Sequence, residues 1–125
     1  MMMYKKKNLK LMNSKILILG FTFKENCSDT RHTQVYEIYK LLSKRGVSTD
    51  IYDPVADPLD TKKEHGIKII SKQIKQNYYD AVILAVAHNQ FRKLGIKKIR
   101  KYCRRNSIIY DLKHIFKKND VDLRL

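Results

Sequence analysis

The sequence has few acidic side chains, few cysteines and no long apolar run. Its 125 residues include 12 Asp and Glu against 27 Lys and Arg, with two cysteines, two prolines and four glycines. No run of eighteen apolar residues occurs, which excludes a membrane-spanning helix. The basic N-terminal segment lacks the apolar stretch of a secretory signal. The cytoplasm is therefore the expected compartment, and no membrane partner is expected.

The two cysteines, Cys27 and Cys103, fall in different predicted elements and show no C-x-x-C spacing. This separation argues against a zinc site and provides no disulfide framework. We predict no metal site, and we interpret both side chains as small buried or loop thiols.

The charge balance is strongly basic, with a formal net charge of +15. Such a balance favours polyanion binding, because lysine and arginine that neutralise phosphates release counterions. The basic residues are nevertheless spread along the chain, and no nucleic-acid recognition motif accompanies them. A solvated basic surface and a general affinity for phosphates both remain open, and no specific nucleic-acid partner is expected.

The apolar pattern alternates between short strands and amphipathic helices, which predicts a single α/β domain. We expect a doubly wound, mainly parallel sheet with helices on both faces, in three αβα layers. Strands are predicted at 16–19, 47–52, 81–87 and 108–110, with a short edge strand at 67–70. Helices are predicted at 33–45 and 71–76, with one or two short helices over 91–103. The polar segment 54–66 is predicted as a loop with one helical turn, and 117–125 as a loose tail.

The stretch around which the chain is organised is the first strand, 16–19, with the polar loop that follows it. Loops at the carboxyl ends of parallel strands form the ligand crevice of such sheets. Lys24 and Arg31 in this loop therefore lie where an anionic ligand, such as a phosphate, is expected. The turn has only Gly20 and no G-x-G-x-x-G motif, so it is not a dinucleotide site in its own right.

Three motifs carry a resemblance to a known family. The sequence GFTFKENCSDTR at 20–31 resembles the signature that opens the C-terminal, nucleotide-sugar-binding domain of the UDP-glucose/GDP-mannose dehydrogenase family. YDP at 52–54 and IYDLK at 109–113 agree with it in order and approximate spacing. AHNQF at 87–91 favours the branch that oxidises N-acetylated UDP-hexosamines. The resemblance covers 14–116 and implies a Rossmann-like fold.

The resemblance also implies roles for individual residues. Lys24 and Lys113 are predicted to bind the UDP moiety of the substrate, as point charges or donors. Phe23 is predicted either to pack against the base or to be part of the core. Arg31 resembles the family arginine that reaches the bound NAD across a domain interface; without NAD it is expected to be a surface arginine, unpaired or held by Asp29.

Other polar residues near the strand ends permit two interpretations. Asp29 and Thr30 are expected to cap the following helix and hold the loop rather than touch a ligand. Asp53 precedes a proline and is interpreted first as a turn former, although an acidic residue here could bind a ribose. His88 and His114 are interpreted as polar loop residues, with hydrogen bonding to the sugar as the alternative.

The family's reaction oxidises the sugar C6 alcohol to a carboxylate by two hydride transfers to NAD and supplies uronic acids for surface polysaccharide. Its nucleophilic cysteine, catalytic lysine and NAD fingerprint belong to other segments, so no catalytic residue is predicted here and the chain alone is expected to be inactive. Residues 1–13 are expected to be a remnant of the helix that links the central domain to this one. A UDP-sugar, the missing domains on another chain, and a second copy of this chain are the expected partners. A non-enzymatic basic module and a non-functional remnant of a truncated gene are the alternatives.

Overall fold

The structure is a computed structural model that describes residues 14–22, 24–30, 33–70 and 73–124. Its centre is a five-stranded sheet in which every pair of neighbouring strands is parallel, in the order β2-β1-β3-β4-β5. The strands are β1 (Lys15–Leu19), β2 (Ser48–Tyr52), β3 (Tyr79–Leu84), β4 (Cys103–Asp111) and β5 (Leu123–Arg124). The predicted α/β fold with a parallel sheet is confirmed.

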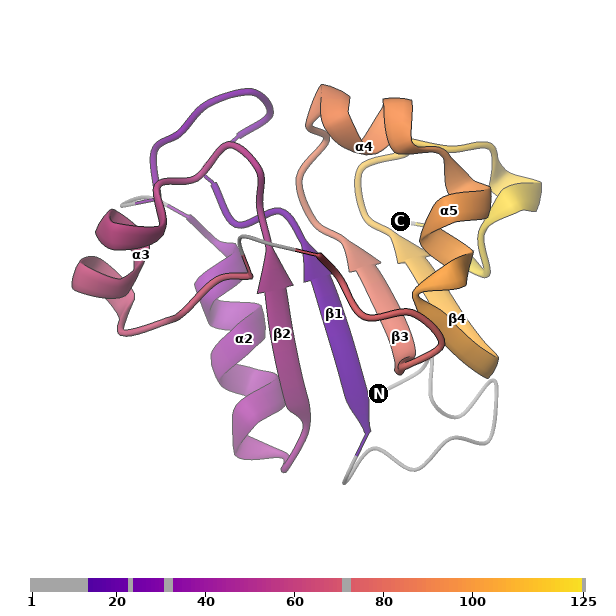
Figure 1. The fold of residues 1–125 in the computed structure, drawn as a ribbon, viewed down its shortest axis with the longest axis horizontal. Coiled ribbons are helices and arrows are strands. Elements are labelled where there is room, and N and C mark those ends of the chain that lie inside the picture. The colour runs from indigo at the N-terminus through magenta and orange to yellow at the C-terminus, as the bar shows by residue number, and fades with distance from the viewer. Residues whose placement is uncertain (1–13, 23, 31–32, 71–72, 125) are drawn as a thin grey trace.

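Helices cover both faces of the sheet (Figure 1). They are α2 (Val35–Lys44), α3 (Pro58–His65), α4 (Asn89–Leu94) and α5 (Ile96–Lys101), followed by the short 3-10 helix η1 (Lys118–Asp120). α2 lies on one face, and α4 and α5 lie on the other. The longest of these helices, α2, has ten residues, and no helix in the described segments is long and apolar enough to cross a membrane.

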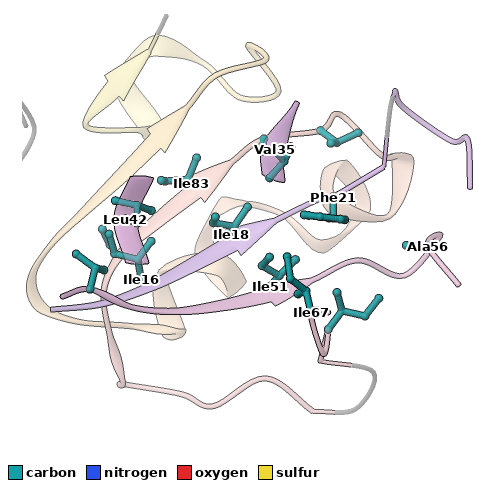
Figure 2. Packing of buried hydrophobic residues seen from close by; sticks show 14 of the residues in the cluster. Ile16, Ile18, Phe21, Val35, Leu42, Ile51, Ala56, Ile67 and Ile83 are labelled. Carbon is teal, nitrogen blue, oxygen red and sulfur yellow. The ribbon is translucent and has the colours of Figure 1, made fainter. Parts of the chain in front are cut away.

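The alternation of side chains in β1 explains why this strand is apolar throughout. Ile16 and Ile18 point into the cluster that packs against α2 (Figure 2). Leu17 and Leu19 point to the opposite face, into the cluster that contains Phe91 of α4. Because helices cover both faces, the strand needs apolar residues at every position rather than at every second one.

α2 is the amphipathic helix that the sequence predicts. It buries Val35 and Leu42 against the sheet, and Gly46 follows it with a φ of 76° (Figure 2). At its start, the Thr33 hydroxyl oxygen accepts from the Val35 N–H at 3.1 Å. Because the N-cap position of α2 is Gln34, the expectation that Asp29 and Thr30 cap this helix is wrong.

α3 is longer than the single turn that the sequence predicts. The Asp57 carboxylate accepts from the backbone N–H groups of Leu59 and Asp60 at its first turn, and Pro58 occupies the first helical position. Gly66 ends the helix in the left-handed conformation, with a φ of 69°. Since only Thr61 is buried, α3 has no apolar period that would identify it, and its caps define it instead.

The segment between α3 and β3 is less regular than predicted. In place of an edge strand at 67–70, Ile70 forms one parallel bridge to Tyr52. Residues 73–76 are not helical, and the predicted cap Ser71 lies outside the described residues.

The C-terminal segment differs from the loose tail that we expected. Val121 is buried, and β5 pairs with the end of β4. Asp122 strengthens this edge, because its carboxylate accepts from the Ile109 N–H at 2.8 Å and its own N–H donates to the Ile109 carbonyl at 3.0 Å. A two-residue strand is too short to produce a recognisable pattern in the sequence.

Candidate functional site

A cleft of about 320 Å³ opens at the carboxyl ends of β1, β3 and β4. From β1 the chain continues outward to β2 on one side, and from β3 it continues outward to β4 on the other. Ligands bind at such a switch point in open parallel sheets. The cleft is lined by Thr22, Lys24, Glu25, Gln34, Val35, Ala85, Val86, Ala87 and Lys113.

The cleft brings together two of the residues singled out from the sequence. Lys24 comes from the loop after β1 and Lys113 from the loop after β4, and both are exposed. Glu25 also lines the cleft, and its carboxylate lies 4.0 Å from Nη2 of Arg92, which offsets its charge at the rim. The predicted site residues Phe23 and Arg31 lie outside the described residues.

Asp111 shapes the loop that carries Lys113. Its carboxylate is fully buried and accepts from the N–H of Lys113 at 3.1 Å and from the N–H of Phe116 at 2.9 Å. The Leu112 N–H donates to the Leu84 carbonyl at the end of β3. The backbone at Lys113 is therefore fixed relative to both strands beside the cleft.

Asp53, at the end of β2, organises the turns on the opposite side. One carboxylate oxygen accepts from Phe21 N–H at 2.6 Å and Thr22 N–H at 3.1 Å, and the other accepts from the N–H groups of Val55 and Ala56. Its interpretation as a turn former is confirmed by the bonds to the two residues after Pro54. Asp53 also fixes the loop after β1, which no local sequence pattern indicates.

Burial would raise the pKa of the Asp53 carboxyl, because it penalises the charged form. Hydrogen bonds from His88 and from backbone N–H groups, including those of Phe21 and Val55, outweigh the burial. The result is a pKa below the ordinary value of 3.8, so the buried group is a carboxylate at neutral pH.

His88 is fully buried rather than exposed in a loop. Its Nδ1 accepts from the Asn26 N–H at 2.9 Å, which assigns the neutral tautomer with hydrogen on Nε2. Nε2 lies 3.0 Å from the Asp53 carboxylate and 3.1 Å from the Thr22 hydroxyl, whose hydrogen points to the Lys24 carbonyl. Both ring nitrogens are therefore engaged within the protein.

Thr30 holds the far end of the same loop against α3. Its hydroxyl donates to the Glu64 carboxylate at 3.2 Å, and its carbonyl lies 2.7 Å from Nε2 of His65. The His65 ring in turn packs edge-on against Phe21, with ring centroids 5.4 Å apart. Thr30 thus holds the loop, as expected, although it does not cap α2.

Gly20 makes the sharp turn out of β1, with a φ of 105°. A Cβ atom at this position would lie 2.6 Å from the Cβ of Val86 and 2.8 Å from its backbone nitrogen. Val86 belongs to the segment after β3, which folds over the end of β1 through bonds to the Leu19 carbonyl. The space beside the glycine is therefore filled by protein, and a side chain at this position would require the Val86 segment to shift.

The arrangement can bind an anion and position it. Two ammonium groups approach the cleft from separate loops, while Ala85, Val86 and Ala87 provide an apolar wall. Among the described residues, no group of three or more His, Cys, Asp or Glu side chains could hold a metal ion. Cys103 is buried, and burial raises the pKa of its thiol, which makes it a poor nucleophile.

Three comparisons with known proteins place the chain. Residues 17–118 match the model of the UDP binding domain of the UDP-glucose/GDP-mannose dehydrogenase family. UDP-N-acetyl-D-glucosamine 6-dehydrogenases from Salmonella typhi and Pseudomonas aeruginosa are 41% and 36% identical over 120 residues each. Each match covers 96% of this chain but only 28% of the relative, so the chain spans about a quarter of the length of these proteins.

The fold also resembles that of solved structures, and again this chain matches only part of a longer protein. An NDP-N-acetyl-D-galactosaminuronic acid dehydrogenase from Methanosarcina mazei superposes with a TM-score of 0.79 over 94% of this chain and 24% of that chain, at 21% identity. The resemblance seen in the sequence motifs is confirmed. It includes the similarity to the branch that oxidises N-acetylated UDP-hexosamines. The chain belongs to the UDP-glucose/GDP-mannose dehydrogenase family and carries its UDP binding domain.

Proposed function

We propose that this chain binds the nucleotide part of a UDP-N-acetylhexosamine in the cleft between the loops after β1, β3 and β4. The observation that supports this most directly is that Lys24 and Lys113, 89 positions apart in the sequence, line the same cleft. Ammonium groups on two loops can contact the pyrophosphate or donate to ribose and uracil oxygens. The volume of about 320 Å³ lies near the lower end of the range of ligand pockets, which suits part of a sugar nucleotide.

In the complete enzyme, this domain would supply position rather than chemistry. By holding UDP, it would place the sugar C6 alcohol next to the groups that oxidise it, converting an encounter into an intramolecular step. We propose that residues 14–116 form this binding unit and that the NAD-binding and central domains supply the rest. The contact of Arg31 with NAD, across the interface with the cofactor-binding domain, remains a prediction.

NAD is proposed as the cofactor of the complete enzyme and not as a ligand of this chain alone. The turn after β1 has one glycine, Gly20, instead of the three glycines of the dinucleotide-binding motif. We therefore expect UDP to bind without NAD.

Replacing either Lys24 or Lys113 with alanine should weaken UDP binding by about tenfold or more, because a hydrogen bond to a charged group contributes roughly 1.5–3 kcal/mol. Lys62→Ala on α3 is the matched control, since Lys62 is exposed and does not line the cleft. Its effect should stay below about twofold, as expected for a distant screened charge. The measurement is calorimetric titration with UDP at constant salt. Equal, small losses of UDP affinity in all three variants would show that Lys24 and Lys113 contribute only through the general positive charge of the protein.

A further inference from the structure

We propose that His88 is the residue that positions the Lys24 loop for nucleotide binding, and that Asp53 holds His88 in place. This inference rests on the proposed function, because it concerns how the same cleft acquires its binding shape. Neither side chain lines the cleft, and both are fully buried. They would act through the backbone of the loop rather than by touching the ligand.

The loop is fixed on both sides of Lys24. Before it, the Thr22 N–H donates to Asp53, and the Thr22 hydroxyl donates to the Lys24 carbonyl at 3.0 Å. After it, the Asn26 N–H donates to His88 Nδ1 at 2.9 Å. The Asp53–His88 pair, joined at 3.0 Å, therefore connects the two anchors.

Several hydrogen bonds hold the conformation at Asn26. Asn26 has a φ of 57°, in the left-handed region, at a short turn where the Cys27 N–H donates to the Lys24 carbonyl at 3.3 Å. The Asn26 side-chain oxygen also accepts from the Asn89 N–H at the start of α4, at 3.1 Å. Two adjacent residues at the start of α4, His88 and Asn89, thus bind this one loop residue.

The direction of each hydrogen bond follows from the chemistry of the ring. A backbone N–H can only donate, so His88 Nδ1 must carry no hydrogen, and Nε2 must carry one. Asp53 accepts that hydrogen and fixes the ring orientation. Loss of the Nδ1 acceptor would leave the Asn26 N–H unpaired and release the loop, while the strands beneath keep their pairing.

Two amide replacements of His88 separate positioning from bulk stability. The carbonyl oxygen of asparagine reaches approximately the position of Nδ1, so His88→Asn keeps an acceptor for Asn26 and loses the donor to Asp53. The longer His88→Gln reaches approximately the position of Nε2, keeps the donor and loses the acceptor. Both variants lose the ring, so a merely structural role predicts similar effects in the two.

The experiment is UDP titration of the full chain and of both variants, at a temperature where each is folded by circular dichroism. We expect His88→Asn to stay within about threefold of the original affinity and His88→Gln to lose about tenfold, the equivalent of one net hydrogen bond. Equal affinities in the two variants, or a loss that follows their thermal stabilities, would overturn the proposal.

Nuclear magnetic resonance of the unsubstituted chain gives a test that needs neither a folded variant nor a bound ligand. We expect the ¹⁵N shifts of His88 to show the Nε2–H tautomer, and the Asn26 amide to exchange with solvent more slowly than the amide of the exposed Ser28. Rapid exchange at Asn26 or the opposite tautomer would overturn the positioning role. If the unsubstituted chain binds no UDP, the proposed function fails, and amide exchange of Asn26 in His88→Asn against His88→Gln decides the positioning role by itself.

Discussion

Replacing Asp53 with alanine should lower the free energy of unfolding by about 3–5 kcal/mol, because several donors around it would lose their acceptor and each buried donor left unpaired costs roughly 1–3 kcal/mol. The carboxylate is fully buried and accepts from four backbone N–H groups as well as from His88. Alanine would leave these donors without partners, and all of the backbone bonds except that of the Val55 N–H are buried. Since domains of this size are stable by roughly 5–15 kcal/mol, the variant should be only marginally folded at room temperature. Urea unfolding at neutral pH measures the difference.

Asp57→Ala is the matched control for this substitution. Asp57 also accepts from two backbone N–H groups, those of Leu59 and Asp60, but these bonds are exposed to solvent. Water can replace the lost acceptor, so the expected cost is about 1 kcal/mol, as for an ordinary helix N-cap. Equal losses in the two variants would contradict the role assigned to Asp53.

The contribution of Asp53 should also depend on pH in a defined direction. Because the folded protein holds the pKa of Asp53 below its ordinary value of 3.8, its stabilising effect is complete above that value. It should be lost as the pH falls below 3.8 through the lower, folded pKa. The difference in stability between the original chain and Asp53→Asn should therefore shrink on acidification over that range.

Replacing Gly20 with alanine should cost about 3 kcal/mol or more. Two effects contribute: the φ of 105° is strained for a residue with a side chain, and the new Cβ would lie 2.6 Å from the Cβ of Val86. The clash is with a backbone segment that is tied to the end of β1, so the neighbour cannot move away easily. Thermal and urea unfolding measure the loss.

Gly66→Ala separates the two effects. Gly66 also has a positive φ, of 69°, but a Cβ there would meet nothing within 4 Å. Its cost should be about 1 kcal/mol, which is the conformational penalty alone. If Gly20→Ala is as stable as Gly66→Ala, Val86 does not pack against the turn as described.

The sequence predicted those parts of the fold that have a local pattern. The apolar runs of β1 and β3 identified buried parallel strands, and Val35 and Leu42 identified α2 through their helical spacing. The full length of α3 was not predicted because few of its side chains are buried, so it has no apolar period. Asp57, Pro58 and Gly66 are nevertheless recognisable start and stop signals. β5 escaped because two residues show no period.

The candidate site was likewise predictable from the sequence only in part. That Lys24 and Lys113 share a cleft follows from the rule that loops at the carboxyl ends of parallel strands converge. The pairing of Asp53 with His88 joins residues 35 positions apart, and no spacing in the sequence indicates it. His88 looked like a loop residue because it follows a strand, but the chain folds it inward at that point.

The measurement that tests the central claim most directly is calorimetric titration of the chain with UDP and, separately, with NAD, each at two salt concentrations. A built cleft with two positioned lysines predicts saturable UDP binding that survives moderate salt, and no binding of NAD. Weak binding of both nucleotides and of an unrelated polyanion, all disappearing together as salt rises, is the behaviour of diffuse charge. That result would contradict a specific nucleotide site and leave a basic fold with general affinity for phosphates.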